Sequence, residues 1–163
     1  MPMPYMTGSS SNRVLHDLMA SDDDSRPLRE GERRLGRFIL PPFQREAVWT
    51  LKQKVALIES IWMELPIGTY VYNQTYYHGK TDMWLIDGQQ RVTAIFEYIN
   101  DGFPIKGSDG IEYYYSEITA VDKRFWGQKC FPAIVLNVED EAKLENIYER
   151  LVYGGTAHDP KED

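Results

Sequence analysis

The chain has 163 residues, enough for one domain, and 42% of them are hydrophobic, so a core can form. The formal net charge of −7 excludes a strong overall attraction to nucleic acid or anionic membranes, so any DNA contact needs a local basic patch. A single cysteine excludes an internal disulfide and a multi-cysteine zinc site. Because the sequence has no signal-peptide core and no run of about 18 apolar residues, we expect a cytoplasmic protein without membrane contact.

Apolar spacing and turn residues predict the elements of the first half of the chain. The clearest is a helix at residues 50–65, where Thr50 is placed to cap the first turn and apolar residues recur at helical intervals. Around it we expect, in chain order, disorder at 1–12, a short helix at 12–20, a charged loop at 21–34, a strand at 35–43, a strand at 69–77, a turn at 78–82 and a strand at 83–86. The last two strands predict a β-hairpin.

The second half of the chain continues with mixed elements. We expect a helix at 89–101, a β-hairpin at 102–118 around Ser108-Asp109-Gly110, a short helix at 121–129, a strand at 130–138 and a helix at 139–153. Because strands and helices alternate only loosely, the sequence predicts an α+β fold, with a small mixed β-sheet packed with helices. Its expected organisation is a flexible or partly helical segment at 1–34, a folded domain at 35–158 and a polar tail at 159–163.

One polar block, Asp87-Gly88-Gln89-Gln90-Arg91, stands where an apolar strand is expected to meet a helix. The first N–H groups of a helix have no partner inside it and carry partial positive charge, which makes such a turn a ready site for phosphate. Gly88 allows a ligand to approach the backbone, and Arg91 offers a planar fork of donors. Gln89 and Gln90 add amide donors, while Asp87 is placed to bind Mg²⁺ or to orient a water or hydroxyl.

The ordinary alternative for this block is purely structural. Asp-Gly before a helix is also a common cap, and Arg91 is then only an ion-pair partner of Asp87 or of a nearby glutamate. Spacing alone leaves both interpretations open.

A second candidate is Gln44-Arg45, which lies between the expected strand at 35–43 and the helix at 50–65. Arg45 would supply a second phosphate contact. Its structural alternative is a surface ion pair with Glu46 or Glu59.

Other candidates are weaker. Gly154-Gly155-Thr156 would form a close-approach loop, but it equally fits the cap at the end of a helix. The basic stretch at 29–34 is typical of a solvated loop, although it could touch a phosphate backbone. The familiar metal-binding histidine pairs and glycine-rich nucleotide loops are missing, since His16, His78 and His158 are scattered.

The segments "ILPPFQREAVW", "WLIDGQQRVTAIFEYINDGFPI" and "YERLVYGGTAH" together resemble a known family. It is the N-terminal domain of GmrSD-type modification-dependent restriction enzymes, within the ParB/sulfiredoxin-like superfamily. The resemblance runs from Phe38 to His158, and the short form is similar to versions encoded by bacteriophages. It implies a ParB/sulfiredoxin-like α+β fold and a bacterial host cytoplasm as the place of action.

The resemblance also implies a function and a site. The family is taken to bind or hydrolyse nucleotides in support of DNA restriction, which implies a nucleoside triphosphate as ligand and Mg²⁺ as cofactor. The motif 87–91 would be the nucleotide site, with Asp87, Gln90 and Arg91 in catalytic roles and Asp87 as the metal ligand. Gln44 and Arg45 would form its second wall. An HNH-like nuclease set is missing from the sequence, and Val152-Tyr153 replaces the asparagine that usually precedes the final Gly-Gly.

Three functions therefore remain open. The first is a Mg²⁺-dependent NTP-hydrolysing or phosphoryl-transfer domain linked to DNA restriction or processing. The second is a non-catalytic phage regulator or decoy, which binds nucleotide, DNA or a host defence protein. The third is a ParB-like DNA nuclease. The expected partners are nucleotide, DNA through a local basic patch, and a nuclease or host protein.

Overall fold

A computed structural model of the protein describes residues 9–19, 26–76 and 79–153. Several expectations lie outside the described residues: those for 1–8, 21–25 and 77–78, for the Gly154-Gly155-Thr156 loop, and for the tail at 159–163. Within the described ranges, no helix is long and apolar enough to cross a membrane.

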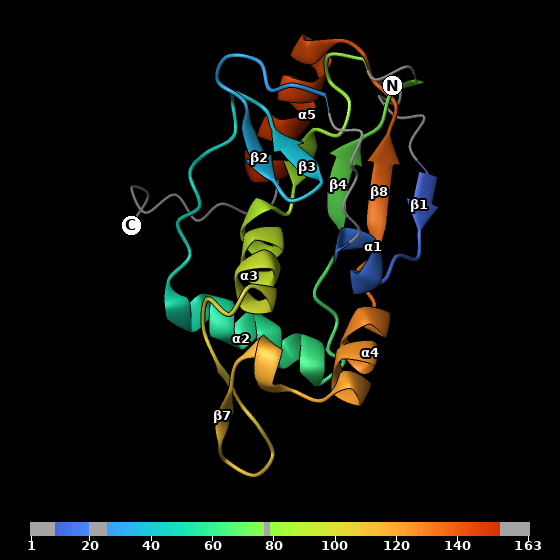
Figure 1. The fold of residues 1–163 in the computed structure, drawn as a ribbon. Coiled ribbons are helices and arrows are strands. Elements are labelled where there is room, and N and C mark those ends of the chain that lie inside the picture. The colour runs from blue at the N-terminus through green and yellow to red at the C-terminus, as the bar shows by residue number, and fades with distance from the viewer. Residues whose placement is uncertain (1–8, 20–25, 77–78, 154–163) are drawn as a thin grey trace, which may run out of the picture.

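Strands and helices are mixed along the chain, as the sequence predicts for an α+β fold (Figure 1). The strands are β1 (Ser9–Ser11), β2 (Arg33–Leu35), β3 (Phe38–Leu40), β4 (Tyr70–Asn73), β5 (Leu85–Asp87), β6 (Ile105–Lys106), β7 (Glu112–Tyr113) and β8 (Ala133–Leu136). The helices are α1 (Leu15–Met19), α2 (Leu51–Trp62), α3 (Gln89–Ile99), α4 (Ala120–Gln128) and α5 (Glu141–Tyr153), with a 3-10 turn at Tyr115–Glu117.

The main sheet has four strands in the order β1-β8-β4-β5. The pair β4–β8 is parallel, whereas β1–β8 and β4–β5 are antiparallel, so the expected mixed sheet and the expected β4–β5 hairpin are both confirmed. The strand β3 adjoins β5 through a parallel bridge between Ile39 and Trp84. This bridge brings the chain that follows β3 to the end of β5.

Two apolar clusters form on opposite faces of the sheet, because successive side chains of a strand alternate between faces. In β4, Tyr70 and Tyr72 join a cluster with residues of α1, α2, α3 and α4, whereas Val71 joins a cluster with residues of α5. The helices α2 and α3 also contact each other. Figure 1 shows α5 at one end of the molecule and α2 and α4 at the other, with the β6–β7 hairpin projecting beyond them.

Helix boundaries follow local signals closely. Thr50 caps α2 as expected: its hydroxyl accepts the N–H of Gln53, and the Gln53 side chain accepts the N–H of Thr50. The helix ends at Trp62, just before Glu64 takes a positive φ of 61°. Thr119 caps α4 in the same way through the N–H of Asp122.

Two expectations about the N-terminal third need correction. The expected strand at 35–43 is present as β3 and ends before Pro41, but it is shorter than expected, because β2 and β3 form a hairpin that turns at Gly36-Arg37. Gly36 has a φ of 57°, and a Cβ there would lie 2.1 Å from the Phe96 ring, so the turn requires glycine. The strand β1 was not expected at all, and it pairs with β8 at the edge of the sheet.

Helix α1, which lies before β2 in the chain, packs against the rest of the fold. Leu15 and Leu18 of α1 are buried in the larger apolar cluster, and the N–H of Leu15 donates to the carbonyl of Lys129. The expected helix at 12–20 is therefore present in shorter form, as part of the same core.

Candidate functional site

The polar block sits where the sequence predicts it. The strand β5 ends at Asp87, and α3 begins at Gln89. Gly88 between them has a φ of 101°, and a Cβ there would lie 2.8 Å from the Cβ of Tyr70, so only glycine fits this turn. Burial and then the neighbouring Tyr72 raise the pKa of Tyr70 to about 12, so its phenol stays uncharged in the core.

The first turn of α3 has no side-chain cap, because its cap residue is Gly88. The N–H of Gly88 donates to Asp87 Oδ1 at 2.9 Å. Gln89, the first helical residue, is 93% buried, and its side chain has no hydrogen-bond partner among the described residues. The turn therefore has backbone donors and an amide that can bind an external acceptor.

Arg91 lies one turn into the helix, and its side chain is only 19% exposed. Its Nη1 donates to the carbonyl of Ile67 at 2.7 Å, and the guanidinium lies 5.6 Å from the centroid of the Phe131 ring. Its Nη2 is 3.7 Å from Asp87 Oδ2, which is an ion pair but longer than a hydrogen bond. Burial lowers the pKa of Arg91, and Asp87 opposes that shift, so the group stays cationic at neutral pH.

The Ile67 carbonyl is the only hydrogen-bond acceptor of Arg91 within the described ranges. Its other N–H groups have no hydrogen-bond acceptor among the described residues, apart from the longer ion pair with Asp87, and can bind an anion. Because Arg91 is held by a backbone carbonyl, its fork is positioned before any ligand arrives.

Asp87 is the only carboxylate of the block, and its side chain is 42% exposed. Across the described residues, no group of three or more His, Cys, Asp or Glu is placed to hold a metal ion. One carboxylate does not form a resident metal centre. It does fit a Mg²⁺ ion that keeps several waters and is bound through phosphate oxygens, as Mg²⁺ commonly is in nucleotide sites.

Gln90 holds a neighbouring loop rather than facing an open site. We call residues 44–50, between β3 and α2, the strap. The Gln90 Oε1 accepts the N–H groups of Val48 at 3.0 Å and of Trp49 at 3.1 Å, and its Nε2 lies 3.4 Å from the carbonyl of Glu46. These contacts fix the strap against the first turn of α3.

Gln44 is buried at the start of the strap. Its Nε2 donates to the carbonyls of Leu85 at 2.7 Å and of Ile86 at 3.1 Å, so both N–H groups of the amide are in use. Gln44 and Gln90 together bring the two sequence motifs side by side, one at each end of the Asp87-Gly88 turn.

Arg45 leaves the strap in a different direction. Its Nη2 donates to the hydroxyl of Tyr153, at the end of α5, and its guanidinium lies 5.1 Å from the centroid of that ring. The structural alternative for Arg45, an ion pair with Glu46 or Glu59, is absent among the described residues, and Glu46 pairs with Arg33. The structure thus places Gln44 against the β5 backbone just before Asp87, and it places Arg45 against α5.

The basic stretch at 29–34 is largely neutralised by ion pairs. Arg29 pairs with Glu32 at 3.0 Å and with Glu141 at 2.7 Å, and Arg33 pairs with Glu46 at 3.1 Å. Glu32 has no exposed side-chain surface; its burial raises its pKa, but hydrogen bonds from Arg26 and Arg29 outweigh this and lower it. Such arginines offer little free positive charge to a phosphate backbone.

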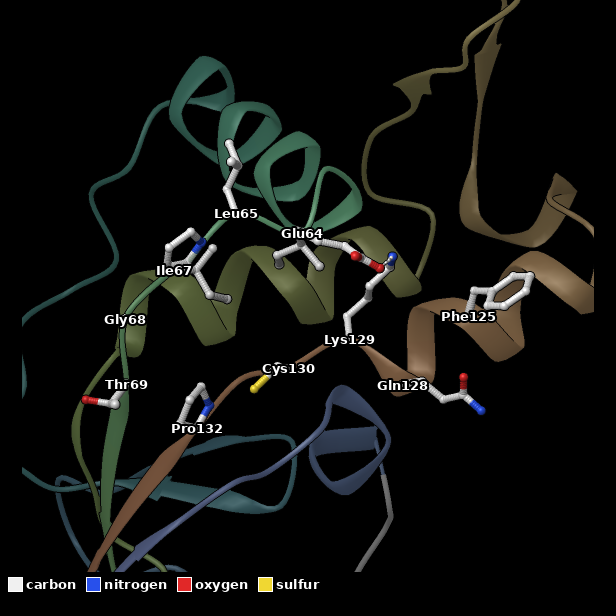
Figure 2. A pocket seen from close by; sticks show the side chains of 12 residues that line it. Glu64, Leu65, Ile67, Gly68, Thr69, Phe125, Gln128, Lys129, Cys130 and Pro132 are labelled. Carbon is white, nitrogen blue, oxygen red and sulfur yellow. Dashed lines mark hydrogen bonds and ion pairs between the residues drawn. The ribbon is translucent and has the colours of Figure 1, made fainter.

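Sequence reasoning missed a groove beside the block. It has a volume of about 790 Å³ and lies between the chain that follows α2 and the chain that follows α4 (Figure 2). Ile67 and Gly68, which contact Arg91, line it. In the sequence, residues 66–68 indicate only the end of a helix, so no local signal points to a cavity here.

Comparison with protein families gives one clear match. The model of the family described as GmrSD restriction endonuclease, N-terminal domain, matches residues 26–160. None of the curated proteins and none of the solved structures compared with the chain matches it. The matched region contains the strap and the block at 87–91, which are the two motifs that the fold brings together. Since the match covers most of the sequence, the chain belongs to the family of GmrSD restriction endonuclease N-terminal domains.

Proposed function

We propose that the protein binds a nucleoside triphosphate at the first turn of α3 and acts on it in a Mg²⁺-dependent hydrolysis or phosphoryl transfer that serves DNA restriction. The observation that supports this proposal most strongly is the environment of Arg91. It is a largely buried cation beside an uncapped helix N-terminus, with only one hydrogen bond to the protein among the described residues. An anion is the natural partner for such a combination of donors.

Each residue then has a definite task. The backbone N–H groups of the first turn and the Gln89 amide bind phosphate oxygens, which Gly88 allows to approach closely. Arg91 binds a further phosphate oxygen and stabilises the charge that develops there during transfer. Arg45, on the other side of the strap, would reach the ligand only by leaving Tyr153, and we propose it as the second cationic contact.

Asp87 is the candidate acidic group at the mouth of the turn. A Mg²⁺ ion bound with the nucleotide would neutralise phosphate charge, and Asp87 would hold one of its coordination positions or a water of its shell. Asp87 also accepts the N–H of Gly88 and forms an ion pair with Arg91, which holds its carboxylate at the turn.

Gln44 and Gln90 position this site instead of touching the ligand. Their amides hold the β5 carbonyls and the strap, respectively, and so fix the geometry of the turn that carries Gly88. This assignment makes them positioning residues in the proposed reaction.

The direct test is titration calorimetry with the four ribonucleoside triphosphates, with and without Mg²⁺. Hydrogen bonds to charged groups contribute about 1.5–3 kcal/mol, so Arg91→Ala should weaken binding by about ten- to a hundred-fold. Arg91→Lys keeps the charge but loses the fork, and it should recover only part of that loss. The matched control is Arg124→Ala, which removes an exposed arginine on α4 with no partner among the described residues. Unchanged nucleotide affinity in Arg91→Ala, with its fold intact, would contradict the proposal.

Phosphate release separates catalysis from binding. Asp87→Ala should lower turnover more than affinity, because a metal or nucleophile contact is strongest in the transition state. If wild-type protein binds nucleotide but releases no phosphate with Mg²⁺, the better account is a non-catalytic regulator. The net charge of −7 and the paired arginines at 29–34 then favour a protein partner over naked DNA.

A further inference from the structure

The groove of about 790 Å³ has a size typical of small-molecule sites. One wall is the chain at 64–69, which leaves α2 and enters β4, and the other is the chain at 128–132, which leaves α4 and enters β8 (Figure 2). Both walls consist mainly of backbone and apolar side chains. The groove is thus formed by segments that the parallel β4–β8 pair holds together.

The lining is apolar and electrically neutral. Leu65, Ile67 and Phe125 contribute apolar surface, and Leu65 and Phe125 are more than half exposed. The only charged residues of the lining are Glu64 and Lys129, whose side-chain atoms meet at 2.7 Å, so each neutralises the other. An uncharged group with apolar faces fits such walls better than an ion does.

This groove shares a wall with the proposed phosphate site. The carbonyl of Ile67 accepts Arg91 Nη1, and a Cβ on Gly68 would lie 2.9 Å from the same nitrogen. Thr69 also lines the groove, and the residue after it, Tyr70, touches Gly88. The segment 67–69 therefore lines the groove, and its Ile67 and Gly68 also contact the Arg91 guanidinium.

We propose that the groove holds the nucleobase of the nucleotide whose phosphates bind at the first turn of α3. This inference rests on the proposed function and adds to it a place for the uncharged part of the ligand. A nucleobase has apolar faces for stacking and a polar edge for hydrogen bonds. Thr69 and Gln128 line the groove, and their side chains have no hydrogen-bond partners within the described ranges.

Cys130 provides a probe that needs no mutation. It is the only cysteine of the chain, it is exposed, and it lines the groove. We would measure the rate at which iodoacetamide alkylates Cys130 in the full-length protein. The rate is compared without ligand, with each nucleoside triphosphate and with inorganic triphosphate, each added at about 100 times its Kd. A ligand that covers the thiol should slow alkylation about 100-fold under these conditions.

The expected result is protection by at least one nucleoside triphosphate and none by inorganic triphosphate, although calorimetry shows that both bind. Protein carrying a bulky maleimide on Cys130 should likewise bind inorganic triphosphate normally and nucleotide at least about tenfold more weakly. Arg91→Ala should require more nucleotide for the same protection.

Other outcomes overturn the inference in distinguishable ways. If nucleotide binds without protecting Cys130, or if inorganic triphosphate protects Cys130 equally, the base does not lie in the groove. The proposed function is then unaffected. No binding of either ligand removes the proposed function and this inference together. Protection by duplex DNA but not by free nucleotides assigns the groove to DNA, and it likewise overturns the proposal.

Discussion

Alanine substitutions at Gly68 and at Gly110 form a matched pair, and the difference between them measures the contact between Gly68 and Arg91. Both glycines have a φ of 80°, but a Cβ on Gly110 would meet nothing within 4 Å, whereas a Cβ on Gly68 would lie 2.9 Å from Arg91 Nη1. Substitution by alanine at this φ costs about 1–2 kcal/mol. For a chain of this length, that corresponds to a decrease in Tm of about 2–8 °C. Gly110→Ala should show this backbone cost alone.

Gly68→Ala should add a second cost, because the methyl group pushes the guanidinium away from the Ile67 carbonyl. That hydrogen bond involves a charged donor and is worth about 1.5–3 kcal/mol. Thermal unfolding of both variants measures the difference, and calorimetry then asks whether nucleotide affinity falls in Gly68→Ala only. An equal loss of stability in the two variants would refute the argument that Gly68 is needed to seat Arg91. A larger loss of stability in Gly68→Ala without any change in nucleotide affinity would support the role of Gly68 in seating Arg91. It would also show that Arg91 does not bind the nucleotide.

The remaining predictions concern the strap and the ion pairs. Gln90→Ala should remove the acceptor of the Val48 and Trp49 N–H groups and speed their hydrogen exchange. Gln90→Glu keeps an acceptor oxygen and should keep these N–H groups protected. Equal exchange rates in both variants would argue against a role of Gln90 in holding the strap. The folded protein has a lower Glu32 pKa than the unfolded chain, whose value is about 4.3. The ion pairs of Glu32 therefore stabilise the fold fully above about pH 4.3, and this stabilisation is lost as the pH falls through the folded pKa. Glu32→Gln should therefore lower Tm at pH 7 by an amount that shrinks towards pH 3, and a pH-independent difference would contradict this.

Much of the fold follows from local sequence signals. The capping box at Thr50 and the helical apolar spacing after it define α2, and the apolar strand ending at Asp87 defines the junction with α3. The residues Ser108-Asp109-Gly110 likewise mark the β6–β7 turn. These features depend on neighbours within a few residues, which is the range over which sequence patterns are informative.

Features that depend on distant partners could not be predicted. The serines of β1 have no strand propensity of their own, and only pairing with β8 makes them a strand. The amides of Gln44 and Gln90 looked like ligand groups in the sequence, but they bind backbone groups about forty residues away. The groove exists only because the parallel pair β4–β8 brings two loops together. The position of Arg91 in the first turn of α3 was predictable, but its hydrogen bond to the Ile67 carbonyl was not.

The order of strands in the sheet has a consequence for how the chain folds. Among the described strands, β8 is the last to be synthesised, yet it lies in the interior of the sheet between β1 and β4. Before residues 133–136 emerge from the ribosome, β1 has no partner and β4 pairs on one edge only. Closing such long-range pairs is slow, because loop-closure entropy must be overcome before the contacts form. We therefore expect nascent chains that stop before β8 to expose apolar strand edges and to need chaperone protection, and proteins truncated there to aggregate.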